Sequence, residues 1–143
     1  MNLPRLCALG LSVFIGCSPH EESAQPYAEV GVFFGGQMQH VKLVEVPPVR
    51  APNVGFRVHF PPGVPAELLA QEITYEVVRP GPEGRRVTKK GTLKLPPGER
   101  RLDQVLSLAE PRKLGLWNVR VLQGTTLLAD RALYLVASQP VTP

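Results

Sequence analysis

Cysteine is almost missing from this chain of 143 residues, which has two, Cys7 and Cys17. Because neither lies beyond residue 17, the rest of the sequence has no disulfide, no thiolate metal cluster and no thiol nucleophile. A strong charge of one sign is also missing, since 16 basic residues stand against 12 acidic ones. So small an excess argues against a nucleic-acid-binding protein.

A hydrophobic run long enough to cross a membrane is absent as well. The apolar stretch Leu6–Ile15 has about ten residues, whereas a membrane-spanning helix needs about twenty. It follows the basic Arg5 and precedes the small Gly16 and a polar stretch, an order typical of an export signal. We therefore expect residues 1–16 to form a signal peptide that is removed after export.

The end of this signal, Phe14-Ile15-Gly16-Cys17, resembles the lipobox of bacterial lipoproteins, in which a small residue precedes a lipidated cysteine. The resemblance implies that Cys17 is diacylated and becomes the new N-terminus, and that Ser18 sorts the protein to an outer membrane, facing the periplasm. Two or three acyl chains anchor a protein firmly, because each buried CH₂ contributes about 0.8 kcal/mol. Residues 17–26 are then a flexible polar tether. The alternative is an ordinary secretory signal with an incidental cysteine.

Alternation of apolar and polar residues predicts strands along the rest of the chain. It is clearest where Val54, Phe56, Val58 and Phe60 point one way and the residues between them point the other. The expected strands are residues 27–34, 39–46, 54–60, 73–78, 87–95, 102–109, 117–122 and 127–137, the first two being one long interrupted strand in an alternative interpretation. Residues 65–71 predict a short helix that closes one end of the molecule.

Short strands separated by prolines and glycines are typical of immunoglobulin-like sandwiches. We expect an all-β fold, an immunoglobulin-like antiparallel β-sandwich of seven to eight strands over residues 27–138, followed by a tail at 139–143. Trp117 is the expected centre of the core, since large aromatic side chains dominate such cores. Neither alternation phase keeps both charges of Asp130-Arg131 outside, so a β-bulge is expected there.

Several segments are similar to small exported bacterial β-sandwich families of uncharacterised function. They are Gly31-Val32-Phe33, Val54-Gly55-Phe56, Gly115–Val121 and Leu127–Asp130. These segments hold turn and core residues, so the resemblance implies a fold and carries no functional site.

Three histidines, His20, His40 and His59, are the first candidates for metal ligands. Met38 and His40 share a strand face and could present sulfur and imidazole to copper. A site needs three or four ligands, however, and the other two histidines lie far away in the sequence. No Gly-x-Ser-x-Gly nucleophile motif is present either. The sequence thus predicts no metal, no cofactor and no enzymatic activity.

Positive charge gathers between residues 79 and 101, where only Glu83 and Glu99 are acidic. The basic residues are Arg79, Arg85, Arg86, Lys89, Lys90, Lys94, Arg100 and Arg101. Lys90 and Lys94 share a strand face that suits lipid headgroups, glycan phosphates or an acidic protein. The alternative, which we favour, is that the lysines keep an edge strand from pairing with other chains.

Together these features favour an accessory lipoprotein of the bacterial cell envelope. Its lipid would bind the membrane, and its sandwich would be a non-enzymatic protein-interaction module that contacts another envelope protein. The alternative is a binding module for an anionic envelope glycan or lipid, through the Arg79–Arg101 region.

Overall fold

The computed structural model describes residues 24–48, 50–108 and 114–138. The predicted signal peptide, Cys17, His20 and the C-terminal residues 139–143 lie outside these ranges. The strands are β2 (Tyr27–Phe34), β3 (Gln37–Gln39), β4 (Leu43–Val46), β5 (Asn53–His59), β6 (Ile73–Pro80), β7 (Arg86–Leu93), β8 (Arg101–Val105), β9 (Gly115–Gln123) and β10 (Thr126–Ala137). One short α-helix, α1 (Ala66–Ala70), and a 3₁₀ helix at Pro82–Gly84 complete the described elements. No helix in these ranges is long and apolar enough to cross a membrane.

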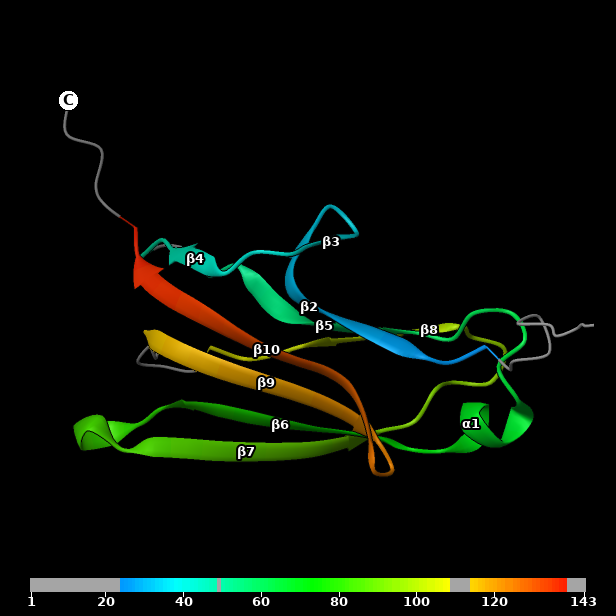
Figure 1. Cartoon of the computed structure of the whole chain (residues 1–143). Helices are drawn as coiled ribbons and strands as arrows, with labels where there is room; N and C mark the ends of the chain where they lie inside the picture. Colours follow the sequence, from blue (N-terminus) through cyan, green and yellow to red (C-terminus); the bar gives the residue numbers. More distant parts are fainter. Residues whose placement is uncertain (1–23, 49, 109–113, 139–143) are drawn as a thin grey trace, which may run out of the picture.

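The strands form two sheets that face each other (Figure 1). The five-stranded sheet has the order β4-β10-β9-β6-β7, and the four-stranded sheet has the order β3-β2-β5-β8. The expected all-β sandwich is therefore confirmed. The described residues hold five plus four strands, one more than the upper end of the expected range.

The additional strand comes from residues 39–46, which were expected as one strand. The chain leaves β3 in one sheet at Gln39 and enters β4 in the other sheet at Leu43. Val41 and Val44 both pack toward the core although they are three residues apart, so no single alternation fits this segment. β4 also runs parallel to β10, with Leu43 opposite Tyr134, so this one pair departs from the expected antiparallel arrangement.

Alternating apolar side chains of both sheets meet in the core. Val54, Phe56 and Val58 of β5 are completely buried, and Trp117 of β9 is 1% exposed. Each large apolar side chain that is fully buried contributes about 1.5–3 kcal/mol. The expectation that Trp117 anchors the core is confirmed.

Helix α1 covers one end of the sandwich, beside the turn between β9 and β10 (Figure 1). Leu68 and Leu69 of the helix pack against the core. The buried Gln123, at the end of β9, donates a 2.7 Å hydrogen bond to the Leu68 carbonyl. This amide ties the helix to the sheet, and the expected closing helix is confirmed.

The N-terminal boundary of the domain lies slightly earlier than the predicted strand. Ala24 packs against the core and Pro26 is buried. The last residues of the predicted 17–26 tether are thus in contact with the sandwich.

The expected irregularity in the last strand lies before Asp130 and Arg131. The β9–β10 register shifts between Leu127 and Ala129, which places the bulge at Leu128. Asp130 and Arg131 are both exposed without a bulge of their own. Arg131 does not need to be rotated out of the core, because its side of β10 opens onto a surface groove at the edge of the sandwich.

Candidate functional site

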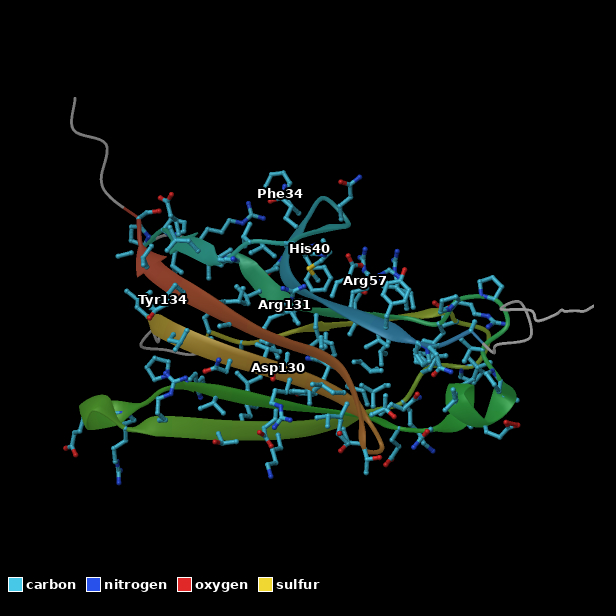
Figure 2. The ribbon with its side chains drawn as sticks, in the orientation of Figure 1. Phe34, His40, Arg57, Asp130, Arg131 and Tyr134 are labelled. Atoms are coloured by element: carbon cyan, nitrogen blue, oxygen red, sulfur yellow. The ribbon has the colours of Figure 1, made fainter. Side chains whose placement is uncertain are left out.

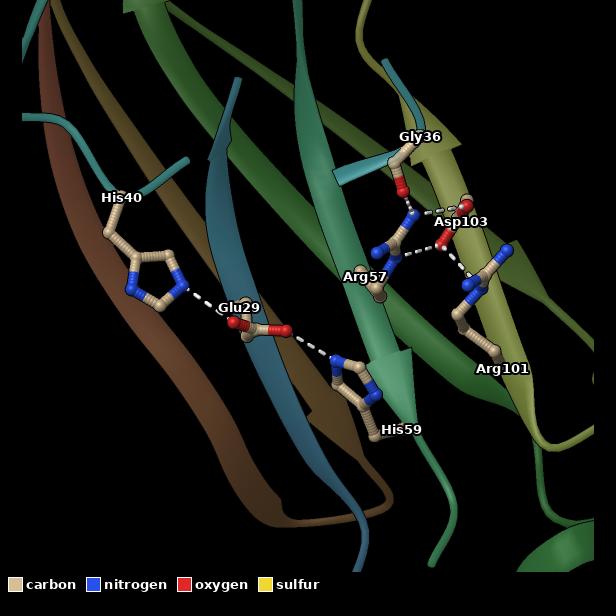
Figure 3. Close-up of polar contacts among 7 residues, drawn as sticks. All are labelled: Glu29, Gly36, His40, Arg57, His59, Arg101 and Asp103. Carbon is tan, nitrogen blue, oxygen red and sulfur yellow. Dashed lines mark hydrogen bonds and ion pairs between the residues drawn. The ribbon is translucent and has the colours of Figure 1, made fainter. Parts of the chain in front are cut away.

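A cluster of polar side chains covers the outer face of the four-stranded sheet (Figure 3). At its centre the Arg57 guanidinium donates to both carboxylate oxygens of Asp103, at 2.8 and 3.1 Å, and to the Gly36 carbonyl at 3.0 Å. The Arg57 charge also lies 5.4 Å from the centre of the Phe33 ring. Arg57 is only 7% exposed, so these contacts replace the water that it lacks. They also hold the turn between β2 and β3 down onto β5.

The second half of this cluster is centred on Glu29, which lies between His40 and His59. Each imidazole Nε2 donates to a different oxygen of the Glu29 carboxylate, at 2.6 Å for His40. The His59 ring in turn stacks on Tyr27, with the ring centres 4.6 Å apart. Glu29 and His59 lie diagonally across the β2–β5 pair, whose register places Tyr27 opposite His59. Through Glu29 of β2, these hydrogen bonds connect His40, which follows β3, to His59 of β5.

The carboxylates of both halves are held in their charged forms. The hydrogen bond from Arg57 is the main cause that lowers the pKa of Asp103 below its usual value of 3.8. Partial burial by itself raises the pKa of Glu29, but the hydrogen bonds and charges of His59 and His40 together bring it below 4.5. The neighbouring cations thus favour the ionised form of both carboxylates.

The cluster does not bring Met38 and His40, which the sequence analysis considered as copper ligands, together in a metal site. Met38 of β3 lies opposite Phe33 of β2. The Met38 side chain also covers Gly31, since a Cβ added to Gly31 would lie 3.2 Å from the Met38 sulfur. The His40 side chain is 62% exposed and is bound to Glu29. Within residues 24–48, 50–108 and 114–138, no group of three or more histidine, cysteine or acidic side chains is placed to hold a metal ion.

The basic residues between 79 and 101 are spread over several surfaces. Arg86 and Lys90 lie on the outer face of the five-stranded sheet, Arg79 lies 5.8 Å from the Trp117 ring, and Lys89 faces the gap toward β8. Arg101 belongs to β8 of the other sheet, where it pairs with Asp103 at 3.8 Å, and Arg100 directly precedes that strand. Arg85 and Lys94 lie exposed at the two ends of β7.

Several of these cations have contacts within the described fold. Arg86 donates to the carbonyls of Leu116 and Val78 and to the Asn118 side chain, at 2.7, 3.3 and 3.0 Å. Pro80 has no N–H to offer to β9, so this guanidinium supplies a donor where the strand pairing ends. β7, which carries most of the lysines, is an edge strand.

One row of alternating charges crosses the outer face of the five-stranded sheet. Lys90 lies opposite Glu76, Glu76 opposite Arg120, and Arg120 opposite Asp130. The ion pairs between them measure 3.6, 3.9 and 3.8 Å. We call this row the charge ladder. It runs through β7, β6, β9 and β10, and it ends on an acidic residue.

The ladder ends where β10 has an open edge. β4 pairs only with residues 134–137 of β10, and no other described strand pairs with residues 126–133 on that side. The Tyr134 N–H points toward β4, because it donates to the Lys42 carbonyl at 2.7 Å. Backbone groups alternate along a strand, so those of Ala132 and Asp130 point to the same side, away from β9.

A groove of about 490 Å³ lies along this open edge. It is lined by Val30 of β2, by residues 40–42 of the crossing segment and by residues 130–134 of β10. Arg131 lies on the side of β10 toward His40 and the four-stranded sheet, and Asp130 lies on the opposite side (Figure 2). Val30 and Leu133 are buried and give the groove an apolar floor.

Apolar side chains are also exposed near the groove on the outer face of the five-stranded sheet. Tyr134 is 53% and Leu43 58% exposed, and the two lie opposite each other. Leu116 follows on β9, opposite Tyr134. Leu116 therefore points away from the core, whereas Trp117, Val119 and Val121 of the same strand are buried.

Comparison with known proteins bears on the fold. No family model matches the chain, and no curated protein does. The chain is similar to the crystal structure of an immunoglobulin-like protein from Pseudomonas aeruginosa, with a TM-score of 0.56. The fold is immunoglobulin-like. The alignment covers 80% of this chain and 98% of that one at 23% sequence identity, so the immunoglobulin-like likeness concerns architecture alone.

Sequence reasoning missed most of this site. It noticed Asp130 and Arg131 only as a break in the alternation of a strand. It separated His40 from His59 because the two are distant in the chain, and it did not consider Glu29. The signal that was present is that Glu29, Arg57 and His59 all occupy the polar phase of their strands.

Proposed function

We propose that this chain is an envelope-anchored lipoprotein, held to the membrane through Cys17, whose immunoglobulin-like sandwich is a non-enzymatic protein-interaction module. The interaction surface is the open edge of β10 together with its groove. The observation that carries the proposal is the backbone of Ala132 and Asp130, which points away from β9 at an exposed position beside an apolar floor. Strand edges of this kind are common sites for binding an extended segment of another protein.

The proposed localisation of the protein rests on the signal at its N-terminus and on the lipobox resemblance. Two or more acyl chains give firm anchoring, so the module would stay at the membrane surface. The membrane to which Ser18 directs it is the outer membrane, with the domain in the periplasm. Loss of labelling by radioactive palmitate in Cys17→Ala would support the anchor, and equal labelling of the two proteins would refute it.

The interaction is tested by crosslinking the full-length protein in cells and purifying it from membrane extracts. The informative variant is Ala132→Pro, which removes an N–H that β9 does not use. Thr88→Pro is the matched control on the opposite edge of the same sheet. Gly81 donates to the Arg85 carbonyl, so Thr88 also points its N–H away from its neighbour strand.

The proposal expects one envelope protein that is recovered with wild type and Thr88→Pro and lost with Ala132→Pro. A parallel sample of Cys17→Ala tests whether the contact also needs the anchor. Recovery of the same protein with Ala132→Pro would show that the interaction, if any, uses another surface. Recovery of no protein from any sample would refute the module.

Binding of an anionic glycan or lipid through the Arg79–Arg101 region is the competing function. It requires an association that weakens with salt and disappears in Lys90→Glu plus Lys94→Glu. The two lysines flank Thr92 on an exposed strand and lie far from the β10 edge in the strand order. Loss of vesicle binding in this variant, together with unchanged protein capture, would assign the two functions to separate faces.

A further inference from the structure

A groove of about 490 Å³ lies along the open edge of β10, where no described strand pairs with residues 126–133 on that side. β4 occupies the same side of β10 from Tyr134 onward, and the chain before β4 turns away to β3 at residues 40–42. An added strand would therefore lie in line with β4 and would pair with Asp130 and Ala132. Each of these residues offers one N–H donor and one carbonyl acceptor on that side. The backbone geometry of the site is that of strand addition.

The charge ladder specifies one side chain of such a strand. Its order is Lys90, Glu76, Arg120 and Asp130, so the charges read plus, minus, plus, minus toward the edge. Residues directly opposite each other on one face interact favourably when their charges differ and unfavourably when they match. The next position on the outer face, beside Asp130, therefore favours lysine or arginine.

The groove specifies the opposite face of the added strand. Side chains of that face would lie over the apolar floor formed by Val30 and Leu133 and beside Val41 of the crossing segment. Because a strand alternates its side chains, the two neighbours of the basic residue would point into this groove. Apolar side chains fit these positions.

A second copy of this chain fits the edge poorly. In antiparallel registers centred on Asp130 or Arg131, that residue would lie opposite its own copy. A register centred on Ala132 would place Asp130 opposite Tyr134, whose edge β4 already occupies. Like charges directly opposite each other destabilise a strand pair. Charges at a strand edge also discourage pairing with arbitrary strands. The same two residues that repel a copy therefore select a partner of complementary charge.

We infer that the partner at the open edge supplies an extended segment with a lysine or arginine beside Asp130 and apolar residues on both sides of it. The inference rests on the proposed function and names the chemistry of the partner. The segment adds to the five-stranded sheet as a neighbour of β10 and continues the charge ladder by one strand.

The test uses two synthetic peptides, Thr-Val-Ser-Val-Lys-Val-Ser-Val-Thr and its counterpart with Glu in place of Lys. Their binding to the full-length purified protein in detergent is measured by fluorescence anisotropy. Wild type should bind the Lys peptide about fivefold more tightly than the Glu peptide, since one pair changes from attraction to repulsion. Asp130→Lys should invert this preference, and Ala132→Pro should weaken both peptides.

Thr88→Lys is the charge control for Asp130→Lys. It places a cation on the outer face of the same sheet, three strands away from β10, and should leave the preference for the Lys peptide unchanged. A photo-crosslinking residue in place of the exposed Leu127 then identifies the natural occupant in cells. An adduct with another protein, lost in Asp130→Lys, is expected.

The outcomes separate this inference from the proposed function. Capture of an envelope protein that is lost in Ala132→Pro but retained in Asp130→Lys, with equal binding of the two peptides, would overturn the inference and leave the interaction module standing. Binding of neither peptide at millimolar concentration would also overturn it. An adduct with a second copy, or with the same chain, would replace the partner segment by that occupant.

Discussion

Removal of Asp103 should destabilise the domain more than removal of the whole ion pair that it forms. Arg57 is 7% exposed in the wild-type protein, and in Asp103→Ala its guanidinium keeps only its bond to the Gly36 carbonyl and its contact with Phe33. Breaking a buried pair from one side costs about 3–5 kcal/mol. The Asp103 side chain is 36% exposed, so solvent screening reduces this to about 2 kcal/mol.

The assay is urea unfolding followed by the fluorescence of Trp117, which is the only tryptophan of the chain and is buried in the core. In a thermal unfolding experiment, the same loss of about 2 kcal/mol would lower the Tm by about 8 °C for a domain of this size. The double variant Arg57→Met plus Asp103→Leu removes both charges and should lie within about 1 kcal/mol of wild type. The reasoning is wrong if the double variant is as unstable as Asp103→Ala, or if Asp103→Ala loses less than 0.5 kcal/mol.

Two further predictions follow from the same face of the sandwich. Because the pKa of Glu29 is lowered below 4.5, its contribution to stability is present above that pH and is lost as the pH falls through the folded-state value. Glu29→Gln should flatten the decrease of unfolding free energy below pH 4.5, and a curve equal to that of the wild type would contradict this. Gly55→Ala should cost about 1–3 kcal/mol in urea unfolding, because its Cβ would lie 2.1 Å from the Gln104 carbonyl oxygen. Gly35→Asn is the control, because Gly35 has a φ of 57° that asparagine tolerates and a Cβ added there would meet no atom within 4 Å. A Gly55→Ala protein as stable as this control would refute the packing argument.

Local pattern was enough to find most strands, because alternation depends only on neighbouring residues. The Val54–Phe60 pattern gave β5, and the Gln123-Gly124 turn gave the hairpin between β9 and β10. The pattern failed at residues 39–46, where the chain passes from one sheet to the other within a few residues. Alternation records which way a side chain points, but it does not record to which sheet the strand belongs.

The candidate site could not be predicted for a related reason. Arg57 and Asp103 are 46 residues apart, and His59 and Glu29 are 30 apart. Only the order β3-β2-β5-β8 brings these side chains together. Likewise, nothing in the composition of β10 shows that it has an open edge, since that depends on where β4 stops.

β7 and the open part of β10 both have an unpaired backbone to which another strand could add, and the two carry different charges. β7 carries exposed Lys89 and Lys90, and charges of one sign repel most approaching strands without choosing among them. On β10, Asp130 and Arg131 point to opposite faces, so an approaching strand must match each face separately. The concentration of charge along the sequence lies on and beside β7, whereas Asp130 and Arg131 are a single pair of charges within β10. Local charge density measures repulsion, whereas selectivity depends on how a few charges are placed around an unpaired backbone.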